Sequence, residues 1–154
     1  MFRLDERLQE DTVALGRFPL CQVLLMKDSR YPWVILVPAQ SNVFEYFHLS
    51  NDDQRQLMAE SVYVAEKMND HFAAKSMNVA ALGNVVAQLH VHHIARYEDD
   101  PAWPGPVWGH SPAVPYEEKA LAERVEEVSG LFASHFLSES EITAETEARD
   151  VVYW

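Results

Sequence analysis

The chain has 154 residues, of which 48% are hydrophobic and 23% charged, and its formal net charge is −12. This length suggests one domain able to bury a core, and no apolar run approaches the roughly 18 residues needed to span a bilayer. The acidic charge argues against a nucleic-acid backbone as partner, because phosphate-tracking surfaces need clustered Lys and Arg.

The first part of the chain predicts a short helix followed by a hairpin. Residues 5–15 carry apolar side chains at roughly helical spacing and predict a helix ending near Gly16. The apolar run 20–26 predicts a strand closed by a polar turn, and the run 33–37, bounded by prolines, predicts a second strand. Because the connection is short, the two strands should pair as an antiparallel hairpin in the centre of a covered sheet.

The strongest helix signal begins at Ser50, whose side chain can accept from backbone N–H groups at a helix start. Apolar residues then recur at spacings of three and four up to Phe72, which predicts about six turns with one face on the sheet. Residues 76–82 regain strand character, Gly83-Asn84 interrupts it, and a further strand continues to about Tyr97. We therefore expect two more antiparallel strands.

The second of these strands holds three of the chain's seven histidines within four positions. Polar and apolar residues alternate from Gln88 to His92, so Gln88, His90 and His92 should project from one face. His93 should face away from them, and we interpret it as a core or subunit-interface histidine. The three polar side chains form a candidate active-site wall.

Beyond this strand the character of the chain changes. A proline-rich loop with Trp103, Trp108 and His110 could close over a ligand, form a packed surface arm or make a dimer contact. A last helix follows, and then an acidic tail whose apolar ending at 151–154 could dock on the body or on a second subunit, or stay loose. The expected organisation is a domain over 1–137, with a core at about 18–98, the loop at 99–116 and the helix at about 117–137, and then the tail at 138–154.

The order of hairpin, long helix, strand and histidine stretch resembles the histidine triad (HIT) family. The pattern of that family is a Gly-Gln pair, three residues, then His-x-His-x-His and two apolar residues. Here Gly83-Asn84 matches the pair, and Gln88, His90 and His92 match the three histidines. The resemblance covers about residues 20–96. It implies an α+β fold with an antiparallel sheet covered by a long helix, to which the predicted C-terminal helix is added, and commonly a homodimer.

The resemblance also implies chemistry on a nucleotide. Known members hydrolyse or transfer a nucleotidyl group by cleaving a bond to the α-phosphate. His90 matches the nucleophile, which forms a covalent nucleotidyl-imidazole and so splits one displacement into two easier steps. Gln88 and Asn84 can supply amide N–H groups to the phosphate, and His92 can donate to an oxygen or help protonate the leaving group. Asp28 is the candidate ribose partner, and no metal or other cofactor is expected.

Two departures from the family pattern leave a second interpretation open. Gln88 stands at the first histidine and cannot be protonated, and Trp33 stands where many members carry a further histidine. The alternative is a catalytically weak nucleotide-binding or regulatory protein. A metal-binding protein is the third possibility, with His90 and His92 as ligands and Asp99, Asp100 or His110 completing the set.

The expected partners are a nucleotide or dinucleotide polyphosphate and a second copy of the chain, without membrane or nucleic-acid backbone. An anionic nucleotide needs positive charge nearby, and the nearest candidates by sequence are Lys27, Arg30 and Arg96. Surface roles are expected for His48, His71 and His135, which lie in or next to predicted helices. The N-terminus lacks the apolar core of a secretory signal and the single Cys21 cannot form an intrachain disulfide, so a cytoplasmic location is expected.

Overall fold

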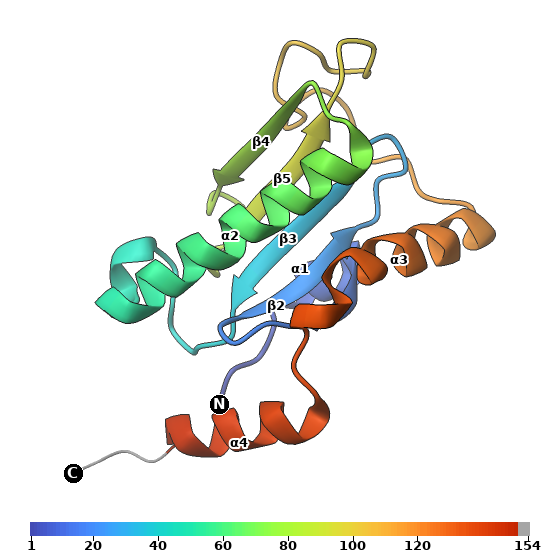
Figure 1. The fold of residues 1–154 in the computed structure, drawn as a ribbon. Helices are drawn as coiled ribbons and strands as arrows, with labels where there is room; N and C mark the ends of the chain where they lie inside the picture. Colours follow the sequence, from blue (N-terminus) through green and yellow to red (C-terminus); the bar gives the residue numbers. More distant parts are fainter. Residues whose placement is uncertain (151–154) are drawn as a thin grey trace.

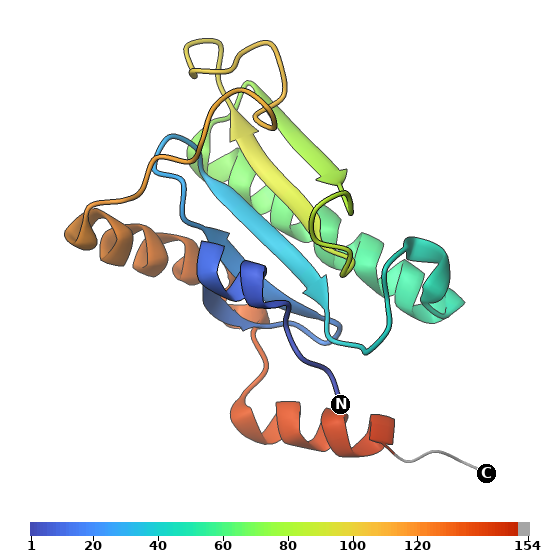
Figure 2. The same cartoon turned by 180° about the vertical axis from the view of Figure 1, so that it is seen from behind.

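The computed structural model describes residues 1–150, which form an antiparallel five-stranded sheet with the order β1-β2-β3-β5-β4. The strands are β1 (Thr12–Arg17), β2 (Cys21–Met26), β3 (Trp33–Pro38), β4 (Ser76–Ala81) and β5 (Val91–Arg96). The helices are α1 (Glu6–Asp11), α2 (Asn51–Phe72), α3 (Glu118–Phe132) and α4 (Glu139–Asp150), with 3-10 turns at Tyr46–His48 and Ala133–His135. Helices α2 and α3 cover one face of the sheet and α1 lies on the other (Figures 1 and 2). The predicted α+β fold with a long covering helix is confirmed.

The centre of the sheet is the predicted β2–β3 hairpin, which is confirmed. Leu24 pairs with Ile35 across it, and β3 pairs in turn with β5, where Ile35 lies opposite His92. All six residues of β3 are buried, because helices cover one face and α1 with the loop after β5 covers the other. The histidine strand β5 therefore pairs with a fully buried strand.

Helix α2 begins where the sequence predicts. Ser50 Oγ accepts from the backbone N–H of Asp53 at 3.1 Å and caps the helix. The buried Glu60 on its sheet side accepts from the backbone N–H groups of Leu20 and Cys21 at 3.1 and 2.9 Å, which ties α2 to the start of β2. No helix within residues 1–150 is long and apolar enough to cross a membrane.

The helix predicted over residues 5–15 ends at Asp11, so that prediction was wrong for its second half. From Thr12 the chain forms β1, an edge strand in which Val13 lies opposite Leu25 of β2. Pairing with an existing strand satisfies the backbone and outweighs the local helical spacing of a short segment. Gly16, expected to end the helix, lies in β1, where a Cβ atom would come within 2.8 Å of the ring of Phe136.

The C-terminal part holds two helices. The predicted helix 117–137 is observed as α3 and the turn after it, and residues 139–150 of the acidic tail form α4. Helix α4 lies apart from the sheet, near the N-terminus (Figure 1). The apolar ending at 151–154, for which docking was considered, lies outside the described residues.

Candidate active site

His90 lies in the loop that enters β5 and not on the strand itself, so the prediction of a strand from Gln88 was wrong. Strand β4 ends at Ala81, opposite Val91, and before that residue the backbone N–H of Leu89 donates to the carbonyl of Val43 at 2.9 Å. The loop brings Nδ1 of His90 to 2.7 Å from the carbonyl oxygen of Gln88. Because a carbonyl only accepts, Nδ1 carries the proton and Nε2 keeps its lone pair.

His92 and His93 point to opposite sides of β5. Nδ1 of His92 accepts from the indole Nε1–H of Trp33 at 2.9 Å, and its ring contacts those of His90 and Trp108 edge-on, with centroids 4.9 and 5.1 Å apart. His93 is fully buried on the α2 side, with Nε2 2.7 Å from Oγ of Ser61. His93 is therefore a core residue, while His90 and His92 remain neighbours as the motif predicted.

Both buried strand histidines are neutral at ordinary pH. Burial lowers the pKa of His92 to about 3, and the nearby His90 and His93 add to this effect. Burial likewise lowers the pKa of His93 to about 4. His92 therefore acts in this site as a neutral hydrogen-bonding group rather than as a cation.

A cavity of about 210 Å³ opens beside His90. Its lining brings together three of the predicted site residues, Asn84, Gln88 and His90. The rest of the lining comes from the loop before α2, the end of β4 and the loop between β4 and β5, namely Phe44, Glu45, Ala81, Leu82, Gly83 and Leu89. The arrangement places the unprotonated nitrogen of His90 next to amide groups at the start of β5.

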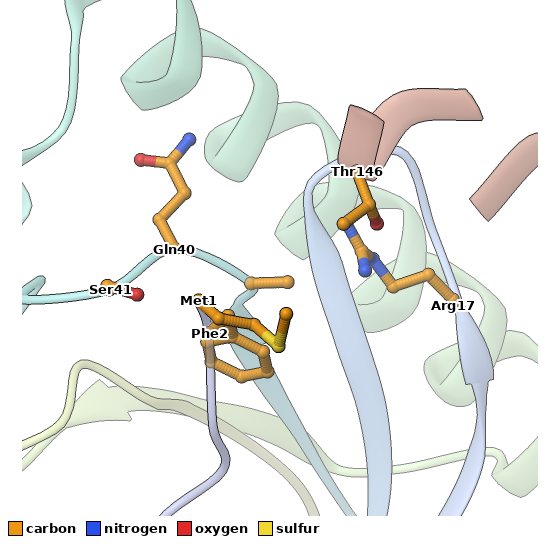
Figure 3. Close-up of a pocket in the computed structure, with 7 residues that line it drawn as sticks. Met1, Phe2, Arg17, Gln40, Ser41 and Thr146 are labelled. Atoms are coloured by element: carbon orange, nitrogen blue, oxygen red, sulfur yellow. The ribbon is translucent and has the colours of Figure 1, made fainter. Parts of the chain in front are cut away.

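A larger hollow of about 560 Å³ lies away from the histidines, between the N-terminus, the end of β3 and α4 (Figure 3). It is lined by Met1, Phe2, Arg17, Ala39, Gln40, Ser41 and Thr146. This lining holds no histidine and no carboxylate, so size alone does not identify the reactive site. The smaller cavity beside the motif histidines is the candidate site.

The side chain of Gln88 is held by the N-terminal segment, defined here as residues 1–5. Its Oε1 accepts from the backbone N–H of Asp5 at 2.9 Å, and its Nε2 donates to the carbonyl of Arg3 at 3.0 Å. The second hydrogen on Nε2 is still able to serve a ligand in the adjoining cavity. The residue at the first histidine position thus ties the N-terminal segment to the rim of the site.

Replacing Gln88 by Ala should release this segment. Both hydrogen bonds disappear, so the amide of Asp5 should exchange with solvent at least about tenfold faster, as loss of one to two net hydrogen bonds implies. Amide hydrogen exchange followed by NMR measures this, with Asn84→Ala as a matched change on the same cavity that leaves both bonds in place. Unchanged protection of Asp5 in the Gln88 variant would contradict the assignment.

Asp28 does not lie at this cavity. It is buried in the β2–β3 turn, where its two oxygens accept from Nε and Nη2 of Arg30 at 3.0 and 2.9 Å. This turn adjoins the Trp33 end of β3, whereas His90 adjoins the Leu36 end, an offset of roughly 10 Å along the strand. Arg30 is thus already paired, and so is Arg96, which binds Asp100.

The proline-rich loop after β5 packs on the sheet face opposite α2. Ala102 and Val107 join the buried cluster that contains Trp33 and Ile94, and Trp108 packs against the same cluster. His110 is exposed, so Trp108 rather than His110 reaches the histidines. Sequence reasoning could not choose between these side chains because the loop has no periodic pattern.

The described part of the chain contains no set of metal ligands of the kind that the metal-binding alternative requires. No group of three or more His, Cys, Asp or Glu side chains within residues 1–150 is placed to hold an ion. Asp100, one of the candidate ligands, accepts from the guanidinium of Arg96 and from three backbone N–H groups.

Comparison with known proteins gives one consistent result. The HIT domain pattern matches residues 7–99. A histidine triad protein from Marinobacter aquaeolei VT8 is 51% identical, with a TM-score of 0.85, over 88% of this chain and 98% of that one. Histidine triad proteins from Sinorhizobium meliloti 1021 and Bradyrhizobium japonicum are 47% and 38% identical, with TM-scores of 0.77 and 0.80, over 82% and 88% of this chain and 96% and 98% of theirs. No curated protein matches the chain.

Proposed function

Since the chain belongs to the histidine triad family, whose members generally bind nucleotides and include nucleotide hydrolases, we propose that it cleaves a bond to the α-phosphate of a nucleotide through His90. The observation that carries this proposal is the 2.7 Å contact between Nδ1 of His90 and the carbonyl of Gln88. It fixes one tautomer and leaves Nε2 as the nucleophile. The carbonyl also stabilises the positive charge that the ring gains as Nε2 bonds to phosphorus.

The reaction has two displacements. In the first, the lone pair on Nε2 of His90 forms a bond to the α-phosphorus, and the leaving group departs with the electron pair of the bond that breaks. In the second, a water oxygen bonds to phosphorus, the P–N bond breaks, and its electron pair returns to Nε2. The proton of the water passes to solvent, and a different acceptor in place of water would make the same chemistry a transfer.

The donors around His90 would hold the phosphate oxygens. Asn84 and Gln88 line the cavity with amide groups, and His92 offers an Nε2–H next to the His90 ring. Each donor aimed at the transition state contributes on the order of 10²- to 10³-fold in rate. Asp28 as a ribose partner stays a proposal that requires the nucleoside to extend along β3 toward the turn.

A specific observation also supports the second candidate, nucleotide binding with little turnover. The cavity of about 210 Å³ is smaller than the roughly 300–1,000 Å³ of common ligand pockets. Trp33, Leu8 and Trp108 belong to the cluster on the sheet face that carries His92, where they leave less room for a nucleoside. A nucleotide would then bind without the geometry that in-line attack needs.

One experiment separates the two candidates. The purified chain is titrated with diadenosine tetraphosphate and adenosine phosphoramidate by calorimetry, and the same mixtures are analysed for released AMP by chromatography. Binding with AMP release supports the hydrolase, whereas binding without release supports the second candidate. The absence of both would contradict nucleotide recognition altogether.

We include a homodimer in this proposal. Met58 and Val62 lie one turn apart on α2 and are 61% and 55% exposed, and Val79 on the neighbouring edge strand β4 is 47% exposed. Apolar side chains gathered on one edge of a domain are typical of an interface. Light scattering should give twice the chain mass of 17.6 kDa, and Val62→Glu should shift the mass to that of one chain. A single-chain mass for the native protein would contradict the dimer.

A further inference from the structure

Trp33 contacts His92 through a group that donates and cannot accept. Its indole Nε1–H lies 2.9 Å from Nδ1 of His92, and both side chains are 6% exposed. Because Nδ1 is the acceptor in this hydrogen bond, it carries no proton, and the neutral ring must carry its proton on Nε2. A proton added to Nδ1 would face the indole N–H directly.

The surroundings of His92 also disfavour a cation. Its partners across the sheet are Ile35 on β3 and Ala80 on β4, and the loop after β5 places the ring of Trp108 against it. The titratable neighbours within the described residues are His90 and His93 on its own segment; both lower the pKa of His92, and neither offers a negative charge to a cation there. No carboxylate in residues 1–150 hydrogen-bonds to His92, and its low pKa agrees with this geometry.

We infer that Trp33 is a positioning residue that holds His92 as a neutral Nε2–H donor, so that the site favours substrates whose leaving group departs as a phosphate or polyphosphate anion. This inference rests on the proposed function and names its substrate class. In a dinucleotide polyphosphate the P–O bond breaks and the leaving oxygen keeps the electron pair, so no proton is needed. In an N-alkyl phosphoramidate the P–N bond breaks and the nitrogen must gain a proton to leave as an amine.

Neither histidine of the site can supply that proton. The Nδ1–H of His90 donates to Gln88, and its Nε2 is bonded to phosphorus in the intermediate. His92 has only the proton on Nε2, and losing it would leave an imidazolate. His92 therefore stabilises a phosphate oxygen by a hydrogen bond and does not act as a general acid.

The kinetic test compares diadenosine tetraphosphate with an adenosine N-alkyl phosphoramidate in the native chain and in Trp33→Phe. The native chain should prefer the polyphosphate. The variant frees Nδ1 for protonation, so the ratio of kcat/KM values should move toward the phosphoramidate by about tenfold, the scale of one hydrogen bond. The shift should lie in kcat, and the phosphoramidate rate should rise as the pH falls below neutrality, because burial still holds the pKa of His92 below its ordinary value in the variant.

Trp108→Phe is the matched control, because it also removes an indole that contacts the ring of His92 but donates no hydrogen bond to it. It should leave the ratio of kcat/KM values near that of the native chain. An unchanged ratio in Trp33→Phe, or an equal shift in Trp108→Phe, would overturn the inference.

A second readout is independent of turnover. Side-chain ¹⁵N NMR of the native chain should show His92 with Nδ1 unprotonated and Nε2 protonated from about pH 8 to 5. A protonated Nδ1 in that spectrum would overturn the tautomer assignment. The spectrum is recorded on the native chain, so this test holds even if Trp33→Phe does not fold. The assigned tautomer in a chain that turns over neither substrate would overturn the leaving-group preference and the proposed hydrolase, while the role of Trp33 in positioning His92 would stand.

Discussion

His90→Ala should lower nucleotide turnover by at least about 10³-fold and leave the chain folded. The substitution removes the one imidazole in the lining of the cavity, the side chain that the proposal makes the nucleophile. His90 is buried, with 6% exposure, but it lies in the loop that enters β5 and belongs to neither buried apolar cluster, so its loss removes one hydrogen bond to Gln88 and no apolar core contact. Far-UV circular dichroism and steady-state kinetics on the same sample measure both expectations.

His71→Ala is the control for this variant. His71 lies on α2, where it pairs with Glu127 of α3 on the covered side of the sheet, away from the cavity. The His71→Ala variant should therefore turn over nucleotide at the native rate. His92→Ala should be less severe than His90→Ala because it removes a donor and not the nucleophile, so equal losses would mean that His92 has a larger role than a hydrogen bond.

Arg96→Ala should give the largest loss of stability, about 3–5 kcal/mol in the free energy of unfolding. The guanidinium is 1% exposed and donates to both oxygens of Asp100 at 2.8 and 3.0 Å, to Asn78 at 2.7 Å and to the carbonyl of Gly105 at 2.8 Å. Its removal leaves the buried carboxylate of Asp100 without a counter-charge. The pKa of Asp100, lowered to about 2 by these contacts with Arg96 and the loop backbone, should return toward its ordinary range.

Urea denaturation measures this loss, with Arg55→Ala as control. Arg55 pairs with Asp52 on the exposed side of α2, and removing such a pair should change stability by less than about 0.5 kcal/mol. Because Arg96 and Asp100 anchor the loop that places Trp108 on His92, Arg96→Ala should also raise the solvent exposure of Trp108, which the difference in tryptophan fluorescence between chains with and without Trp108→Phe reports. A loss of stability equal to that of Arg55→Ala would contradict the anchoring role.

The regular part of the fold is predictable from local signals that agree with one another. Ser50 and the apolar spacing up to Phe72 define α2, and the turn after Met26 defines the hairpin, because capping and periodicity act within a few residues. In the segment from Thr12 to Arg17, the local signals do not indicate the strand that is observed. Its state depends on the distant strand β2, with which it pairs, and a pattern within the segment does not contain that information.

In the site, too, local spacing predicts some features, while others depend on contacts between distant residues. The spacing of His90 and His92 predicts that their rings lie close together, and they do. The pattern does not predict that Gln88 binds the N-terminal segment, because that contact joins residues more than 80 positions apart. Nor does it predict the hydrogen bond from Trp33 to His92, which depends on the register of β3 against β5. In the sequence, Trp33 replaces a histidine that many family members carry. In the fold, its indole N–H donates a hydrogen bond to His92.

Intact-protein mass spectrometry after brief mixing with diadenosine tetraphosphate or adenosine phosphoramidate tests the central claim most directly. The proposal predicts a mass increase of one adenylyl group in the native chain and none in His90→Ala, because the P–N bond forms on Nε2 of that residue. An adduct that persists in His90→Ala would place the nucleophile elsewhere. Nucleotide release without any adduct in the native chain would contradict the covalent mechanism.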